Sequence, residues 1–445
     1  MTTACVIIQD FILFYELMKS LAYQSTLGCD NAFNAICNRW VLERVLAHTI
    51  TCGSSRYVSI QLDTMGEDSD TTTTTAGDRR SARIHSTGSS IDSETGHHKR
   101  RLMPMMYQMY ESQYEDLRGT IYGPDSPDFH PAQASETLRK ALSGMDTKDQ
   151  IVINTLLYHN NFQRQKILSA YEDMYGRKLI DDLEEETGGY FLEMSQALFK
   201  PAPQYDTMNL HRSLSNRYAD RSVAIEIACT RSARQLRVIR ETYLNDYKKS
   251  LEKDIAIKVE GTVGRMLTLL LCKSRNEDGK RDDQLVETHA KMLVNNSIDE
   301  IAKNLTLFEQ IFVGNSWKHI GAVFDRVDEL RNGERDIETL IRKNKMLHSE
   351  IRQIFLTIIR VSRNMQLFFA ELLRAAMTGE RPDHQTIIRI TVSRSEIDLY
   401  DIGEEYKRKY NRSLEYDIQQ TCSGDYMRLV SALLSASSNN NNNIM

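Results

Sequence analysis

The chain has 445 residues, of which 41% are hydrophobic and 26% are charged, and these fractions are typical of a globular protein with a real core. Its 56 lysines and arginines are balanced by 61 aspartates and glutamates, so the formal net charge is only -5, which excludes nucleic-acid binding through bulk positive charge. No apolar run in the sequence reaches the roughly 18 residues needed to cross a bilayer.

The first 127 residues divide into two segments of different composition. Residues 1–53 carry apolar patches typical of one or two helices, and we expect an N-terminal segment there. Residues 54–127 are rich in threonine, serine, glycine and charge, which predicts a disordered low-complexity linker. The basic cluster at 97–101 is more often a solvated piece of such a linker than a nuclear-import signal, and both interpretations stay open.

Two segments of the remaining chain recur at the same spacings. Residues 138–144 and 171–183 each reappear 72 residues later and again after a further 163 residues. The longer gap leaves room for one more copy, whose worn counterpart lies at 324–341. Because residues 204–381 contain no proline, and apolar residues recur at a spacing of three to four, each unit is predicted to be mostly helical.

These repeats predict four units followed by a short tail. Their expected bounds are 128–200, 201–275, 283–363 (divergent) and 364–438, with an asparagine-rich tail at 439–445. The usual phosphate-loop, zinc-protease, nucleophile-elbow and EF-hand signatures are absent, and the eleven histidines are dispersed. The sequence therefore offers no catalytic constellation, and we expect a protein that is not an enzyme.

The repeated segments resemble the annexin family. The resemblance covers about 310 of the 445 residues. It is carried by Glu136 to Gly144 followed by Thr147, by Gly176 to Leu183, by Val392 to Leu399, and by Ser423 to Tyr426. It implies an all-α fold of four annexin-like repeats with about five helices each, preceded here by a largely disordered N-terminal region. It also implies Ca²⁺ sites that bridge the protein to anionic phospholipid.

Carried over residue by residue, the resemblance places a metal site in the first unit. Glu186 lies 42 residues after Gly144 and would supply the carboxylate. Ca²⁺ prefers six to eight oxygen ligands, many of them carbonyls. The predicted ligands are Leu142, Gly144 and Asp146 through their carbonyls, Glu186 through its carboxylate, and Thr147 and Asp149 in a minor second site.

The other three units lack an acid at the corresponding place, which we call the acid position. Lys258, Asn344 and Thr421 stand there in the second, third and fourth units. Arg217 and Tyr218 further disturb the loop of the second unit. We therefore expect one Ca²⁺ site, in the first repeat.

Two functions remain open from the sequence. The leading one is a calcium-dependent phospholipid-binding protein of the cytoplasm, peripherally associated with anionic membranes such as those containing phosphatidylserine, and weakened because only one site looks intact. The alternative is a calcium-independent helical interaction scaffold derived from an annexin, favoured by the losses at Lys258 and Thr421. Protein partners would bind through the N-terminal region, and the composition favours no nucleic-acid partner.

Overall fold

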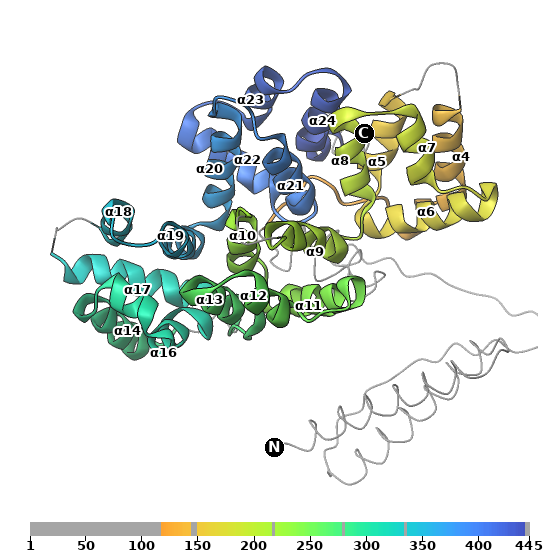
Figure 1. Cartoon of the computed structure of the whole chain (residues 1–445). Helices are drawn as coiled ribbons and strands as arrows, with labels where there is room; N and C mark the ends of the chain where they lie inside the picture. The colour runs from red at the N-terminus through yellow and green to blue at the C-terminus, as the bar shows by residue number, and fades with distance from the viewer. Residues whose placement is uncertain (1–116, 144–148, 216–218, 278–280, 333–335, 441–445) are drawn as a thin grey trace, which may run out of the picture. The chain divides into compact units, whose positions relative to one another are not determined.

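The computed structural model describes residues 117–143, 149–215, 219–277, 281–332 and 336–440. Throughout this part the chain forms helices joined by short connections and no β-strand, which confirms the predicted all-α class (Figure 1). The helices expected within residues 1–53, and the disorder expected up to residue 116, concern positions outside the described residues.

The helices fall into four successive groups. The first is α4 (Pro131–Leu142), α5 (Asp149–Tyr158), α6 (Asn161–Tyr175), α7 (Leu179–Glu186) and α8 (Gly189–Phe199), preceded by the short 3₁₀ helix η2 (Ser126–Asp128). The second is α9 (Ala202–Ser213), α10 (Ser222–Thr230), α11 (Ala233–Tyr247), α12 (Leu251–Lys258) and α13 (Gly261–Cys272). Both groups have the five helices that the resemblance implied.

The third and fourth groups follow the same plan. The third is α14 (Asp283–Asn295), α15 (Ile298–Lys303), α16 (Leu305–Phe308), the π-helical turn η3 (Glu309–Val313), α17 (Trp317–Leu330), α18 (Ile337–Lys343) and α19 (Ser349–Arg363). The fourth is α20 (Met365–Thr378), α21 (His384–Arg394), α22 (Leu399–Tyr410), α23 (Leu414–Thr421) and α24 (Gly424–Asn440). The second element of the third group is interrupted at Asn304, and α24 continues into the segment predicted as a polar tail.

A buried polar network recurs inside the repeats and explains one of the repeated sequence segments. The Tyr171 hydroxyl donates to the Asp182 carboxylate at 2.5 Å, and the Arg139 guanidinium donates to the same carboxylate at 2.7 Å. Burial opposes ionisation of Asp182, but these bonds and that from Arg177 lower its pKa. The counterparts of this trio are Tyr406, Asp417 and Arg374 in the fourth repeat, and Tyr243, Asp254 and His211 in the second. These acids are therefore structural.

The third helix of three repeats ends at a residue in the left-handed region. These residues are Gly176 (φ 61°), Lys248 (φ 55°) and Asn411 (φ 54°). Such a residue turns the chain away from the helix end and lets its N–H reach a carbonyl of the last turn. Only glycine adopts this conformation without a steric penalty from Cβ.

Replacing Lys248 by glycine is therefore expected to raise the free energy of unfolding by about 1 kcal/mol. Urea denaturation of the wild type and of Lys248→Gly measures the change. The reverse substitution, Gly176→Lys, should lower the stability by a similar amount, because no atom lies within 4 Å of an added Cβ and the backbone alone is strained. A less stable Lys248→Gly variant would contradict the expectation.

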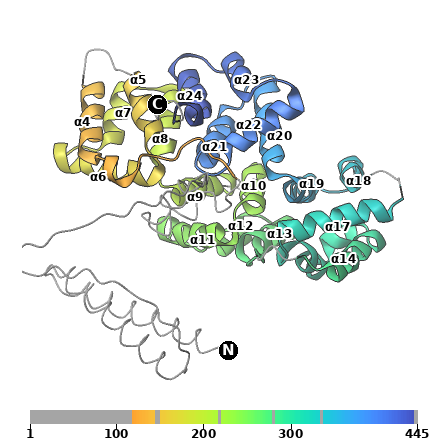
Figure 2. The same cartoon turned by 180° about the vertical axis from the view of Figure 1, so that it is seen from behind.

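Helices from repeats far apart in sequence pack side by side. Helix α24 contacts α5 and α8, and α21 contacts α8 and α9, so the fourth repeat lies against the first and second. Helix α10 of the second repeat contacts α19 of the third. Figures 1 and 2 show α24 and α21 beside α8 from both sides.

Residues 117–127 correct part of the predicted disorder. The amides of Thr120 and Ile121 donate to the Ser395 carbonyl at 2.6 and 3.1 Å, and both residues are buried. The Arg118 guanidinium binds the Asp401 carboxylate at 2.8 Å. Polar composition alone suggested a linker here, but the backbone of this segment finds hydrogen-bond partners on the fourth repeat.

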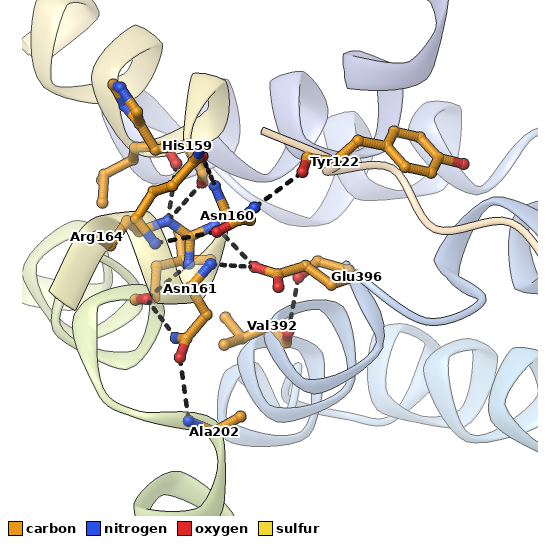
Figure 3. Close-up of polar contacts among 12 residues, drawn as sticks. Tyr122, His159, Asn160, Asn161, Arg164, Ala202, Val392 and Glu396 are labelled. Atoms are coloured by element: carbon orange, nitrogen blue, oxygen red, sulfur yellow. Dashed lines mark hydrogen bonds and ion pairs between the residues drawn. The ribbon is translucent and has the colours of Figure 1, made fainter. Parts of the chain in front are cut away.

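Figure 3 shows the cluster that joins the first and fourth repeats, which we call the junction cluster (Asn160, Asn161, Arg164 and Glu396). The Arg164 side chain is 2% exposed and donates to the Leu198 carbonyl at 2.7 Å, besides two carbonyls of the α5–α6 turn. The Asn161 amide donates to the Glu396 carboxylate at 2.7 Å, and that carboxylate lies 3.4 Å from Arg164. Asn160 donates to the Tyr122 carbonyl, so residues 117–127 are tied into the same cluster.

Two buried histidines of the third repeat form a direct hydrogen bond. His289 Nδ1 lies 3.1 Å from His319 Nε2, and the two residues are 1% and 4% exposed. One ring must donate and the other accept, which requires at least one neutral ring. Burial lowers the pKa of both, with Asp282 opposing and Arg281 adding to the shift at His319.

Because these pKa values are lower in the folded chain than the usual value of about 6.5, the unfolded chain takes up protons first as the pH falls. We therefore expect stability to be full above about pH 7 and to decline as the pH falls through about 6.5. Urea midpoints at about pH 7.5 and about pH 5.5 measure the loss, and His319→Gln should reduce it. An equal loss in wild type and variant would show that the pair does not contribute.

Candidate metal centre

Three helices of the first repeat meet where the sequence predicts a metal site. Leu142 ends α4, Asp149 begins α5 and Glu186 ends α7, and α4 contacts both α5 and α7. The Leu142 side chain is buried, so its carbonyl oxygen is the group that could serve as a ligand. The remaining predicted ligands lie outside the described residues: Gly144, Asp146 and Thr147. The six-residue set therefore stays a prediction.

The C-terminal end of α7 is strongly negative. Glu184, Glu185 and Glu186 follow one another, and the last turn holds no basic residue. Glu184 accepts a hydrogen bond from Gln196 and Glu185 accepts one from Arg177, whereas Glu186 stands exposed at the very end of the helix. Because the helix dipole places further negative charge at this end, a bound cation would stabilise it. Carboxylate and carbonyl oxygens are the donors that Ca²⁺ prefers, so the residues present fit this ion.

Asp149 is less suited to hold a cation. Partial burial raises the pKa of its carboxyl group, although the nearby Arg428 opposes the shift. A carboxyl that is harder to ionise competes poorly with Glu186 for a divalent ion. This supports its assignment to the minor site only.

Protein cations occupy the acid position of the second repeat. The Lys258 ammonium binds the Asp254 carboxylate at 2.7 Å. The buried Arg221 guanidinium donates to the carbonyls of Ala219 at 2.9 Å and Lys258 at 3.3 Å, and forms an ion pair with Glu350 of α19 at 3.1 Å. Two positive side chains therefore stand among oxygens that could otherwise face a metal ion, which disfavours a second divalent cation here.

An amide closes the corresponding loop of the third repeat. The Asn344 carbonyl oxygen accepts from the Met346 and Leu347 amides at 3.0 and 3.3 Å. Its side-chain nitrogen donates to the Asp299 carboxylate of α15 at 3.2 Å. The neutral amide thus links the two loops directly, and it supplies no charge to attract an ion.

The fourth repeat has lost its acid without gaining a cation at that place. The Thr421 hydroxyl donates to the Asp417 carbonyl at 2.7 Å, within its own helix. Asp383, in the loop after Arg381 and Pro382, caps α21 by accepting from the Thr386 amide at 3.1 Å. Throughout the described part of the chain, no group of three or more histidine, cysteine, aspartate or glutamate side chains is placed to hold a metal ion.

The role of Arg221 was missed by the sequence reasoning, which considered Arg217 and Tyr218 in the same loop. Those two residues lie outside the described part, whereas Arg221 reaches across to the third repeat. A basic residue directly after the loop aspartate, Asp220, was the available signal. Its partner Glu350 lies 129 residues further along, so the contact itself could not be predicted.

Comparison with known proteins follows this geometry. The family model described as Annexin matches residues 133–198, 205–270 and 368–433. Annexin A5 of Bos taurus is 35% identical over 312 residues, which are 70% of this chain and 95% of that protein. Annexin A3 of Mus musculus is 36% identical over 310 residues, covering 69% and 94% of the two chains.

Solved structures agree with these relatives. A structure of annexin III superposes with a TM-score of 0.67 at 32% identity, covering 73% of this chain and 98% of that one. Chicken annexin V, solved in complex with Zn²⁺, gives a TM-score of 0.66 at 32% identity, with 72% and 98% covered. Among the described helices, none is long and apolar enough to span a bilayer. The repeats, the helix order and the extent of identity together show that this chain belongs to the annexin family.

Proposed function

We propose that this annexin is a peripheral membrane protein that binds anionic phospholipid, phosphatidylserine included, through Ca²⁺ held by one site in its first repeat. Annexins generally bind phospholipid in a calcium-dependent manner and are generally not enzymes. The finer assignment takes 128–200, 201–275, 283–363 and 364–438 as the four repeats. It places the protein in the cytoplasm and at plasma or vesicle membranes.

One observation carries the proposal, namely the contrast between the four acid positions. Glu186 is an exposed carboxylate at the negative end of α7. The same place holds Lys258 in an ion pair in the second repeat, the bridging amide of Asn344 in the third, and the hydroxyl of Thr421 in the fourth. Only the first repeat combines a negative charge with the turn that precedes the last helix, where Gly189 has a φ of 59°.

The residues of the first repeat would divide the work. Glu186 would supply the charge, while the carbonyls of Leu142, Gly144 and Asp146 would supply neutral oxygens. When bound, Ca²⁺ would bridge these oxygens and a lipid phosphate. A single bridge gives weak adsorption, because several sites acting together raise the effective concentration of each at the surface.

A second candidate, a calcium-independent helical scaffold, is favoured by the ion-free links in the second and third repeats. There the Arg221–Glu350 ion pair and the Asn344–Asp299 hydrogen bond hold the loops without a metal. On this alternative, protein partners would bind through residues 1–127, and the basic cluster at 97–101 would allow a nuclear pool.

Sedimentation with phosphatidylserine vesicles separates the two candidates. The proposal expects pelleting that increases with Ca²⁺ and that chelator reverses. Pelleting that is absent in Ca²⁺, or that does not increase when Ca²⁺ is added, would favour the scaffold instead.

A further inference from the structure

The two most exposed large hydrophobic side chains among the described residues lie beside acid positions that have lost their acid. Ile257 is 71% exposed and directly precedes Lys258 at the end of α12. Met346 is 89% exposed and follows Asn344 by two residues, in the loop between α18 and α19. Exposing an apolar side chain to water carries a free-energy cost that burial in an apolar phase would remove.

The exposure of Met346 is built into the loop. Its amide is bonded to the Asn344 side chain, and the next residue, Leu347, is only 3% exposed and packs in the core. Asn344 in turn is bonded to Asp299 of α15. The loop is thus held at both sides of Met346, so this side chain is presented outward without any bound ion.

The apolar side chains are confined to the repeats that lost the ion in favour of protein contacts. The position of Ile257 is held by a polar residue in the first and fourth repeats, and the position of Met346 by glycine or a polar residue. The counterparts are Glu185 and Gln420 for Ile257, and Gly188 and Ser423 for Met346. The second and third repeats therefore combine an ion-free loop with an apolar tip.

Charge around Met346 has the sign that suits an anionic surface. The exposed residues Arg342 and Lys343 form the last turn of α18, and the exposed Lys345 follows Asn344. Arg342 is paired with Glu338 one turn earlier, which leaves Lys343 and Lys345 flanking the tip. Each lysine near an anionic bilayer strengthens binding about fivefold, and an adjacent apolar side chain adds burial in the interface.

We propose that the 342–348 loop of the third repeat, assisted by Ile257 of the second, is a calcium-independent contact for anionic lipid bilayers. Met346 enters the headgroup region while Lys343 and Lys345 lie against lipid phosphates. This inference rests on the proposed function, since it assigns the same membrane to a second surface. The first repeat then supplies the calcium-dependent part of binding and the third repeat supplies the constant part.

The test measures partition of the full chain onto vesicles in excess chelator. Vesicles of phosphatidylserine and phosphatidylcholine should bind the wild type, and pure phosphatidylcholine should bind it much less. Lys343→Gln/Lys345→Gln should lower the chelator-resistant partition about twentyfold, and Met346→Ser should lower it about fivefold. Ile257→Ser should act in the same direction.

Matched controls change the same residue types elsewhere. Leu244→Ser removes an apolar side chain that is 51% exposed on α11, and Lys166→Gln/Lys407→Gln removes two exposed lysines from α6 and α22. Neither control should change binding in chelator by more than about twofold. Because all these positions are exposed, folding is preserved and circular dichroism checks it.

The inference and the proposed function fail in different ways. If wild type does not bind in chelator, or if the loop variants bind like their controls, the loop is not a membrane contact. Calcium-dependent binding in the same samples would still uphold the first-repeat site. If the loop variants lose chelator-resistant binding but Ca²⁺ adds nothing to any variant, the loop contact stands and the calcium proposal falls.

Discussion

Glu186→Gln is expected to remove most of the calcium-dependent binding to phosphatidylserine vesicles. The substitution keeps the shape of the side chain and removes the one charge that the first-repeat site offers at its acid position. Carbonyl oxygens are neutral, so without this carboxylate the loop attracts a divalent cation weakly in competition with water. Calorimetric Ca²⁺ titration of wild type and variant, each with vesicles present, measures the loss.

Glu185→Gln is the matched control for this prediction. Glu185 is the preceding acid of the same helix end, but it binds Arg177 at 2.7 Å. It should therefore leave the calcium titration nearly unchanged. Thermal stability of Glu186→Gln without Ca²⁺ should be equal to that of the wild type or slightly higher, because three adjacent carboxylates repel one another when no ion is bound. Identical titrations of wild type and Glu186→Gln would place the calcium site elsewhere or remove it altogether.

Arg164→Met is expected to destabilise the folded chain by about 3–5 kcal/mol. The substitution keeps much of the apolar stem but removes the guanidinium that serves three backbone carbonyls and Glu396 in the junction cluster (Figure 3). Burial already raises the pKa of Glu396, and Arg164 opposes that shift. Without Arg164 the carboxylate is buried with much less compensation. Urea denaturation measures the change in the free energy of unfolding.

Two further variants show whether the loss arises from the buried charge. Arg164→Met/Glu396→Gln should recover part of the stability, since the second change removes the uncompensated carboxylate. Lys140→Met, which removes a side chain that is 73% exposed in its pair with Glu136, should leave the denaturation midpoint almost unchanged. A midpoint for Arg164→Met close to that of Lys140→Met would mean that the junction cluster contributes little to stability.

The repeated segments were sufficient to predict the fold. Tyr171 and its copies recur at fixed spacing because each closes the same hydrogen bond to an aspartate 11 residues later, within one repeat. Such contacts are local, so their sequence pattern survives in each copy. The start of the fourth helix was equally predictable, because Ser250 and Ser413 precede it and cap it by accepting from a backbone amide.

Residues 117–127 show why composition was insufficient elsewhere. Their polar character predicted disorder, since a segment with little apolar surface cannot offset its loss of conformational entropy alone. The folded fourth repeat supplies the missing partners, among them the Ser395 carbonyl and the Asp401 carboxylate. These partners lie more than 270 residues away along the chain, beyond the reach of any local pattern.

By itself, the sequence determined the all-α class, the repeated helical units and the identity of the residue at each acid position, because these depend on residue type and spacing. Only the tertiary structure decided what replaces the acid where it is lost. Arg221 reaches Glu350 from the next repeat, and Asn344 bonds to Asp299 of α15. Both contacts join segments that are distant in the chain, and a long polar side chain chooses its partner only after packing has placed the candidates within hydrogen-bond range.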